Sequence, residues 1–225
     1  KMVLNRTRTA IRFTMIISIP SAVGLAVLAE PICNLLFASH DNSLLVRLMM
    51  SGSAAVVFFS LSTMSNAILQ GSNHMSAPLY HSAAALIPHI ISLIFFQRVM
   101  GLGIYSVVYS NILFALVVCV LNSLSIRRFL RYRQDYKKTF LIPTVCSAVM
   151  GLVSYGVYFG VHSLLPDNMA DKRIGLILAV GLAICGAVGI YGLLLLKFGG
   201  FTDRELRDMP MGTRILAAAR RLHLR

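Results

Sequence analysis

The sequence contains little charge, and its charged residues are unevenly spread. Only 13% of its 225 residues are Asp, Glu, Lys or Arg, against roughly 25% in soluble domains. None of these four residue types occurs between Leu48 and Gln97. A soluble domain needs a charged exterior on all sides, so the composition excludes that class. It indicates an all-α polytopic membrane helix bundle.

Long uncharged runs locate the membrane-spanning helices. A helix that crosses ~30 Å of hydrocarbon needs about 20 residues, and the longest uncharged run breaks at the polar, turn-forming segment Gln70–Pro78. We expect six spans within a transmembrane domain of residues 1–197. They lie near residues 13–37, 45–69, 76–97, 103–126, 139–163 and 174–196. Glu30 interrupts the first span, so the apolar residues after Pro31 are expected to form an interfacial turn.

The basic residues are concentrated on one side of these predicted spans. The formal net charge is +13, and seventeen Lys and Arg fall on the side of the two termini and the 127–138 loop, against four on the other. The positive-inside rule places both termini on the cytoplasmic side of the cell membrane. We expect anionic lipid headgroups to be the partners of this charge. No nucleic-acid partner is expected, because no recognition helix or aromatic stacking platform accompanies the charge.

Residues 198–225 are expected to form a basic cytoplasmic tail. Thr202–Glu205 has the pattern of a capping box, and a second short helix can begin at Thr213. That helix would carry apolar residues on one face and arginines on the other, which is typical of an amphipathic helix lying on a membrane surface.

The sequence also lacks the residue sets that catalysis and metal binding require. Its four cysteines lie one per apolar span, and its six histidines show no ligand spacing. There is no nucleophile–base set and no glycine-rich phosphate loop. We therefore expect no enzymatic activity, no cofactor and no metal.

Uncharged polar side chains occur inside three of the predicted spans. They are Ser62, Ser65 and Asn66 in the second span with Gln70 at its end, His81 and His89 in the third, and Asn111 and Asn122 in the fourth. Ser62, Asn66 and Gln70 recur every four residues and therefore form a stripe along one helical face. Lipid cannot satisfy an amide, so this face must contact protein or water. Interhelical hydrogen bonding explains any one of these residues, whereas their presence on three spans favours a shared hydrated cavity.

Proline and small residues mark possible hinges and close contacts. Pro20, Pro88 and Pro143 lie inside the first, third and fifth spans, where each removes a backbone donor and can kink its helix. The fifth span also contains the small-residue pairs Ser147 with Gly151 and Gly156 with Gly160, which permit close helix packing.

Three segments resemble one family of membrane transporters. Residues 19–37 (IPSAVGLAVLAEPICNLLF), 61–79 (LSTMSNAILQGSNHMSAPL) and 206–215 (LRDMPMGTRI) resemble the multidrug/oligosaccharidyl-lipid/polysaccharide exporter superfamily. Within it, the chain is most similar to polysaccharide biosynthesis proteins like stage V sporulation protein B and to lipid II flippases. The resemblance implies about fourteen helices in two lobes around a central cavity, which alternates between inward and outward access. The six spans would then be the last six, and the missing N-terminal lobe, preceding Lys1, would be their partner.

The leading hypothesis is a flippase for a lipid-linked oligosaccharide or a lipid II-like peptidoglycan precursor. The polar stripe would hold the sugar headgroup, and Arg12 at a basic inner rim would attract the pyrophosphate. A cation-coupled multidrug exporter of the same superfamily is an alternative. It needs an intramembrane carboxylate, and of the eight acids only Glu30 lies in or beside a span. A third possibility is a non-transporting membrane scaffold, whose stripe would be buried against a partner helix.

Overall fold

The structure, a computed structural model, describes residues 2–37, 41–130, 137–164 and 173–199. These residues form α1 (Met2–Val27), α2 (Ala29–Leu36), α3 (Ser43–Gly71), α4 (Ala77–Arg98), α5 (Tyr105–Leu130), the π-helix η1 (Lys137–Leu141), α6 (Ile142–Leu164) and α8 (Arg173–Lys197). Six helices are long and apolar enough to cross a membrane: α1, α3, α4, α5, α6 with η1, and α8. No strand occurs in the described ranges, so the predicted all-α, six-span bundle is confirmed. The predicted helices of the tail lie outside the described residues.

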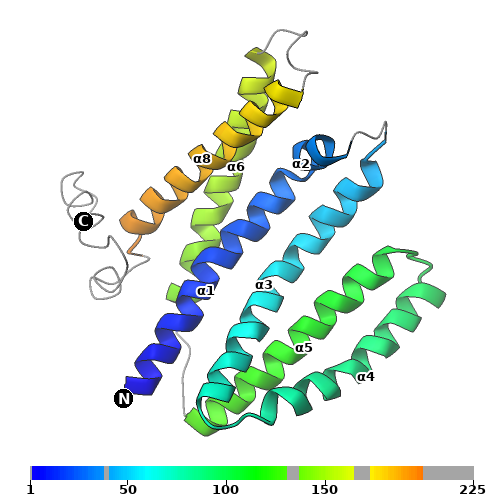
Figure 1. Ribbon diagram of the computed structural model, residues 1–225, viewed down its shortest axis with the longest axis vertical. Coiled ribbons are helices and arrows are strands. Elements are labelled where there is room, and N and C mark those ends of the chain that lie inside the picture. The colour runs from blue at the N-terminus through cyan, green and yellow to red at the C-terminus, as the bar shows by residue number, and fades with distance from the viewer. Residues whose placement is uncertain (1, 38–40, 131–136, 165–172, 200–225) are drawn as a thin grey trace.

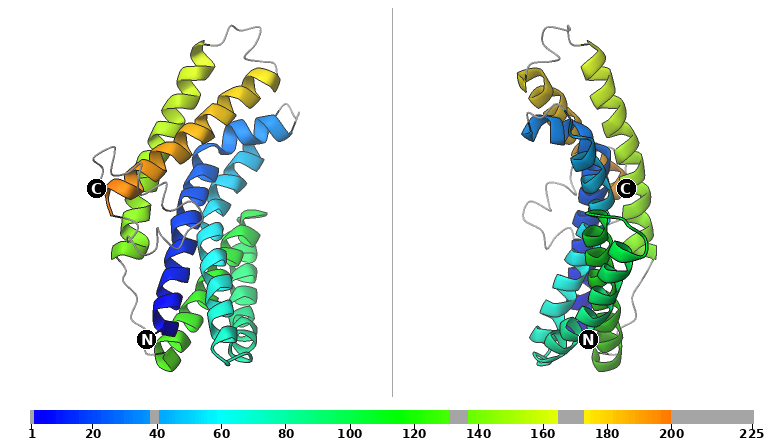
Figure 2. Two further views of the ribbon diagram at one scale, coloured as in Figure 1. Left: turned by 60° about the vertical axis from the view of Figure 1, so that its left-hand side comes forward. Right: turned by 90° about the vertical axis from the view of Figure 1, so that its right-hand side faces the viewer.

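The six long helices stand in a row, each contacting the next. Figure 1 shows α6, α1, α3, α5 and α4 side by side in this order, with α8 crossing α6. Helices that are neighbours in the order α8, α6, α1, α3, α5 and α4 pack against each other. The side view in Figure 2 shows how thin this arrangement is. The helix α1 is central to it. Its Ile11 packs with Leu69 of α3 and Ile126 of α5, whereas its Ile16 packs in a cluster with Cys146 of α6 and Tyr191 of α8.

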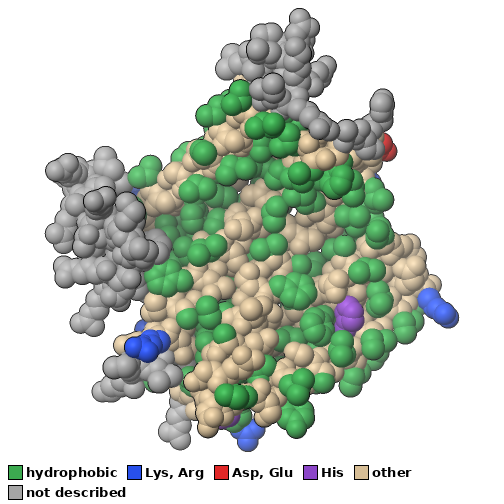
Figure 3. Space-filling model, viewed as in Figure 1, with side chains coloured by type: hydrophobic (Ala, Val, Ile, Leu, Met, Phe, Trp, Pro, Cys, Tyr) green, Lys and Arg blue, Asp and Glu red, His purple; other side chains and the backbone are tan. Residues whose placement is uncertain are grey.

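The surface of the row suits a lipid environment. Figure 3 shows hydrophobic side chains spread over the visible face, with the Lys and Arg of the described residues at its edges. Exposed large hydrophobic residues include Ile91 on α4, Leu152 on α6 and Val188 on α8. An apolar exterior of this extent is costly in water and favourable in a bilayer.

The first span differs from its prediction. The helix α1 begins at Met2 rather than at residue 13 and ends at Val27, and α2 follows after a break at Leu28 (φ −97°, ψ 16°). The predicted interfacial turn is therefore a short helix with Glu30 in its first turn, where a carboxylate interacts favourably with the helix dipole. The prediction began too late because charge was taken to end a span, yet Arg12 is only 5% exposed and packs inside the protein.

Pro20 lies inside α1, and a side chain from α8 replaces the hydrogen bond that this proline removes. Proline has no N–H to donate to the carbonyl four residues earlier, which here belongs to Ile16. The Tyr191 hydroxyl of α8 donates to that carbonyl over 2.7 Å, and Tyr191 is 9% exposed. The proline therefore leaves no unsatisfied acceptor in the apolar interior.

Replacing Tyr191 by phenylalanine is expected to destabilise the protein by about 1 kcal/mol, because the Ile16 carbonyl loses its partner in a dry interior. Unfolding of the full-length protein in mixed detergent micelles measures this loss. Tyr155, which is 59% exposed on α6, provides the matched control as Tyr155→Phe. Equal stability of the two variants would contradict the role assigned to the Tyr191 hydroxyl.

The other two prolines occupy different positions. Pro88 lies within α4, as predicted. Pro143 is the second residue of α6 and lies two residues after η1 ends at Leu141, so it stands where the π-helical turn passes into the α-helix.

Small residues bring α1 and α6 into close contact at one point. A Cβ atom added to Gly151 would lie 2.9 Å from Val23 Cγ1 and 3.2 Å from Val27 Cγ2. Gly156 and Gly160 have no neighbouring atom within 4 Å of such a Cβ. Of the two small-residue pairs in this span, only the earlier one contributes a glycine to this close approach.

Candidate functional site

A hydrogen-bonded network joins α3, α4 and α5 through side chains. Asn122 of α5 is fully buried at 0% exposure. Its Nδ2 donates to Asn66 Oδ1 of α3 over 2.7 Å, and its Oδ1 lies 2.7 Å from His81 Nδ1 of α4. Ser125, one turn after Asn122, places its Oγ 3.1 Å from His81 Nε2. Each of the three helices thus contributes at least one polar side chain to a single network.

The contacts of Asn122 define which nitrogen of the His81 ring carries the hydrogen. The Nδ2 of Asn122 also faces the backbone carbonyl of Ser62 at 3.5 Å, which only a donor can approach favourably. The Oδ1 of Asn122 therefore faces His81, and His81 Nδ1 carries the hydrogen in that bond. In the neutral ring, Nε2 is consequently an acceptor and the Ser125 hydroxyl donates to it.

The other predicted polar residues of α3 lie in different surroundings. Ser62 and Ser65 are 6% and 3% exposed, and the Ser62 hydroxyl donates to the Phe59 carbonyl over 2.9 Å. Gln70 is exposed near the end of α3. The structure thus buries the first part of the stripe against neighbouring helices. Contact of these side chains with a substrate stays a prediction.

His89 and Asn111 do not join the network. His89 Nδ1 lies 3.0 Å from the Ser110 carbonyl, and its ring meets Phe114 edge-on. Asn111 is half-buried on α5. Ser125 was not among the predicted residues, although its spacing of three residues from Asn122 places the two on one helical face.

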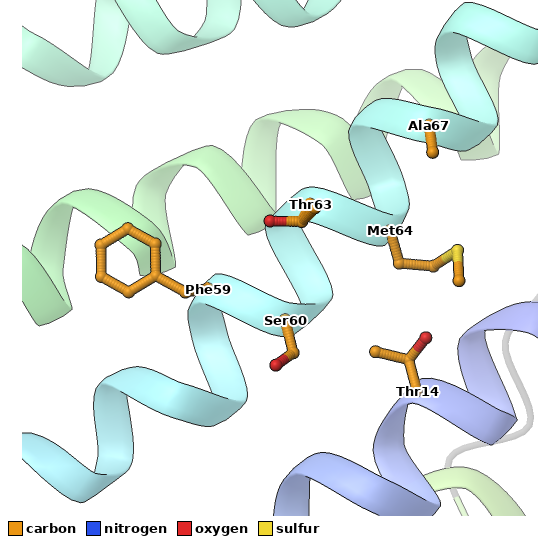
Figure 4. Close-up of a pocket in the computed structure, with 6 residues that line it drawn as sticks. All are labelled: Thr14, Phe59, Ser60, Thr63, Met64 and Ala67. Atoms are coloured by element: carbon orange, nitrogen blue, oxygen red, sulfur yellow. The ribbon is translucent and has the colours of Figure 1, made fainter.

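A groove on the adjacent face of α3 was also missed. It has a volume of about 470 Å³, lies between α1 and α3, and is lined by Thr14, Phe59, Ser60, Thr63, Met64 and Ala67. Figure 4 shows Ser60 and Met64 pointing from α3 towards α1, with Thr14 opposite them. The Thr14 hydroxyl donates to the Ala10 carbonyl over 3.0 Å. Ser60 and Thr63 fall outside the four-residue repeat of the stripe, which is why the pattern did not indicate them.

The groove offers hydroxyl groups on a largely apolar surface. Three of its six lining residues carry a hydroxyl, and the others are apolar. This mixture can hydrogen-bond a polyhydroxylated molecule while packing against its apolar faces. Arg12, predicted at an inner rim, lies on α1 one turn before Ile16 and on the same helical face, which is directed towards α6 and α8. It is therefore packed inside the bundle.

A known membrane protein is similar to nearly the whole chain. The uncharacterized membrane protein YabM of Bacillus subtilis (strain 168) is 22% identical over 222 residues, which cover 98% of this chain. The chain is a multi-pass membrane protein. It spans about 40% of the length of this relative. No protein-family model and no solved structure matches the chain.

Proposed function

We propose that the chain is the C-terminal portion of a membrane flippase that moves a lipid-linked oligosaccharide or a peptidoglycan precursor by alternating access. The groove between α1 and α3 is the observation that carries this proposal, because it places Thr14, Ser60 and Thr63 at an open surface of spanning helices. Hydroxyl groups that line an opening within a membrane are typical of a polar pathway. The rest of the polypeptide would cover this face and complete the cavity.

The dimensions and chemistry of the groove suit a sugar headgroup. It has a volume of about 470 Å³ and is largely open, so further helices of the polypeptide would have to close it around a headgroup. Serine and threonine hydroxyls both donate and accept hydrogen bonds, so they can pair with a sugar hydroxyl whether it acts as donor or as acceptor. Phe59 and Met64 supply apolar surface for the carbon faces of the sugar rings. The lipid tail would remain in the bilayer.

The decisive assay measures movement of a fluorescent lipid-linked sugar across liposomes that contain the full-length protein. Extrusion of cationic dyes from the same liposomes is measured in parallel. Sugar-lipid movement without dye extrusion supports the flippase. Dye extrusion without sugar-lipid movement would instead indicate a multidrug exporter.

A non-transporting scaffold is a second candidate, and one observation favours it. Ser62 and Asn66 contribute to hydrogen bonds inside the bundle, as expected of a stripe with a purely structural role. The scaffold predicts that α3 has no hydrated face in the complete protein. Water access to the groove therefore distinguishes the two functions.

Cysteine labelling is expected to separate the two faces of α3. On a background without native cysteines, Ser60→Cys and Thr63→Cys should react with a membrane-impermeant maleimide, because both positions line the groove. Ser62→Cys and Ser65→Cys are the matched controls and should stay protected, because their side chains are buried. If positions 60 and 63 are as protected as positions 62 and 65 in every state, the groove is not a water-filled pathway.

A further inference from the structure

We infer that His81 is a proton-binding site built into the junction of α3, α4 and α5. The imidazole ring of histidine can hold a hydrogen on either nitrogen or on both. His81 lies inside a predicted span, one turn after the start of α4 at Ala77. It is half-buried, and its nearness to the turn between α3 and α4 gives protons a short path from water. This inference does not depend on the proposed function.

The two acceptors around the ring make protonation possible without loss of a contact. In the neutral ring, Nδ1–H donates to Asn122 Oδ1 and Nε2 accepts from the Ser125 hydroxyl. A proton arriving from water forms an N–H bond at Nε2. The Ser125 hydroxyl then turns its hydrogen away, and its oxygen accepts from Nε2–H. Both hydrogen bonds that the charged ring donates are charge-assisted, so they are stronger than the hydrogen bonds of the neutral ring.

The displaced hydrogen of Ser125 has an acceptor within its own helix. A serine hydroxyl can donate to the carbonyl four residues earlier, which here belongs to Leu121. The same arrangement occurs elsewhere in this protein. Ser110 donates to the Ser106 carbonyl and Ser72 donates to the Ile68 carbonyl, both over 2.7 Å. When the ring is charged, both of its N–H groups and the Ser125 hydroxyl thus still have hydrogen-bond partners.

The charged residues on α3, α4 and α5 are all basic. No Asp or Glu occurs between Asp41 and Asp135, so α3, α4, α5 and their connecting turns contribute no acid. The helix α3 has no titratable side chain after Arg47. The other titratable groups are Tyr80, His89 and Arg98 on α4, Tyr105, Tyr109, Cys119, Arg127 and Arg128 on α5, and His74 in the turn. Arg127 and Arg128 are exposed and oppose protonation only through a screened interaction. Neutral acceptors therefore have to stabilise the bound proton.

Proton binding at this position is coupled to helix packing. The site exists only while α5 supplies Asn122 and Ser125 to the ring on α4. A rearrangement that separates α4 from α5 therefore changes the proton affinity of His81. By linkage, proton binding changes the equilibrium constant of that rearrangement by the same factor. His81 was predicted as an uncharged polar residue of the third span, because only carboxylates were weighed as intramembrane ionisable groups.

Nitrogen NMR of histidine-labelled full-length protein in lipid nanodiscs tests the inference directly. The His81 signals are assigned by their absence in His81→Gln, and the protonated fraction of the ring is followed between pH 5 and 8. We expect hydrogen on Nδ1 alone at high pH and on both nitrogens at low pH. A ring that stays in one state over the whole range, or that carries its single hydrogen on Nε2, would overturn the inference.

Three variants distinguish the network from a merely accessible histidine. Ser125→Ala should lower the proton affinity of the ring about fivefold, because the charged form loses the stronger bond. Asn122→Asp should raise it about tenfold by placing a carboxylate against Nδ1–H. Ser123→Ala is the control, since Ser123 is exposed on the same helix and should leave the affinity unchanged. Equal affinities in the Ser125 and Ser123 variants would also contradict the inference.

Discussion

Replacing Gly151 by leucine is expected to force α1 and α6 apart and to destabilise the protein by about 2 kcal/mol. Even the first carbon of a new side chain would lie 2.9 Å from Val23 Cγ1 and 3.2 Å from Val27 Cγ2. Valine is restricted at χ1 and cannot easily turn its methyl groups away. The two helix backbones must therefore separate, and the packing on which membrane helices depend is lost along the contact.

Gly156→Leu is the matched control, because it lies in the same helix with no neighbouring atom within 4 Å of an added Cβ. Unfolding of the full-length protein in mixed detergent micelles compares the two variants. Both substitutions replace glycine by leucine and therefore change the intrinsic helix propensity equally. The difference between their free energies of unfolding therefore reports the contact alone. If Gly151→Leu is as stable as Gly156→Leu, α1 and α6 do not pack closely at this point.

The sequence predicted the helices well where hydrophobicity alone determines them. The second span was expected at residues 45–69 and is α3, Ser43–Gly71, and the last was expected at 174–196 and is α8, Arg173–Lys197. The prediction failed where an arginine is accommodated by tertiary structure. A count of charges cannot distinguish a buried Arg12 from a charge that ends a helix, because the difference depends on which helices surround it.

The polar residues were predicted as a group, but their partners were not. Periodicity places Ser62, Asn66 and Gln70 on one face of α3, and it does not show which helix covers that face. The structure shows that α5 does, through Asn122. Sequence spacing likewise could not find the groove, because Thr14 and Ser60 are 46 positions apart and meet only when α1 packs beside α3.

The groove lies at the boundary between two groups of helices that are held together differently. The helices α3, α4 and α5 share the polar network. The helices α1, α6 and α8 are joined by the cluster around Ile16 and by the Tyr191 hydroxyl. Between the two groups, α1 meets α3 at the groove, through Thr14, Ser60 and Met64, and nearby through the buried Ile11, which packs with Leu69 of α3 and Ile126 of α5. If the chain acts as proposed, relative movement of these groups would widen or close the groove while each group stays intact.

Filling the groove is therefore expected to block transport. Ser60→Trp places a large rigid side chain between α1 and α3, where Ser60 points towards α1 (Figure 4). We expect movement of a fluorescent lipid-linked sugar to fall at least about tenfold, because even modest misplacement of a bound substrate reduces rates strongly. The rate is measured in liposomes that contain equal amounts of folded full-length protein.

Ala54→Trp is the matched control for the added bulk. Ala54 lies on the same helix, is exposed, and does not line the groove, so a tryptophan there extends into lipid, where aromatic side chains are tolerated. The control should move the sugar lipid at the rate of the unaltered protein. Unchanged transport in a folded Ser60→Trp protein would show that the substrate passes elsewhere. Equal losses in both variants would trace the effect to α3 as a whole, since the two substitutions share only the helix that carries them.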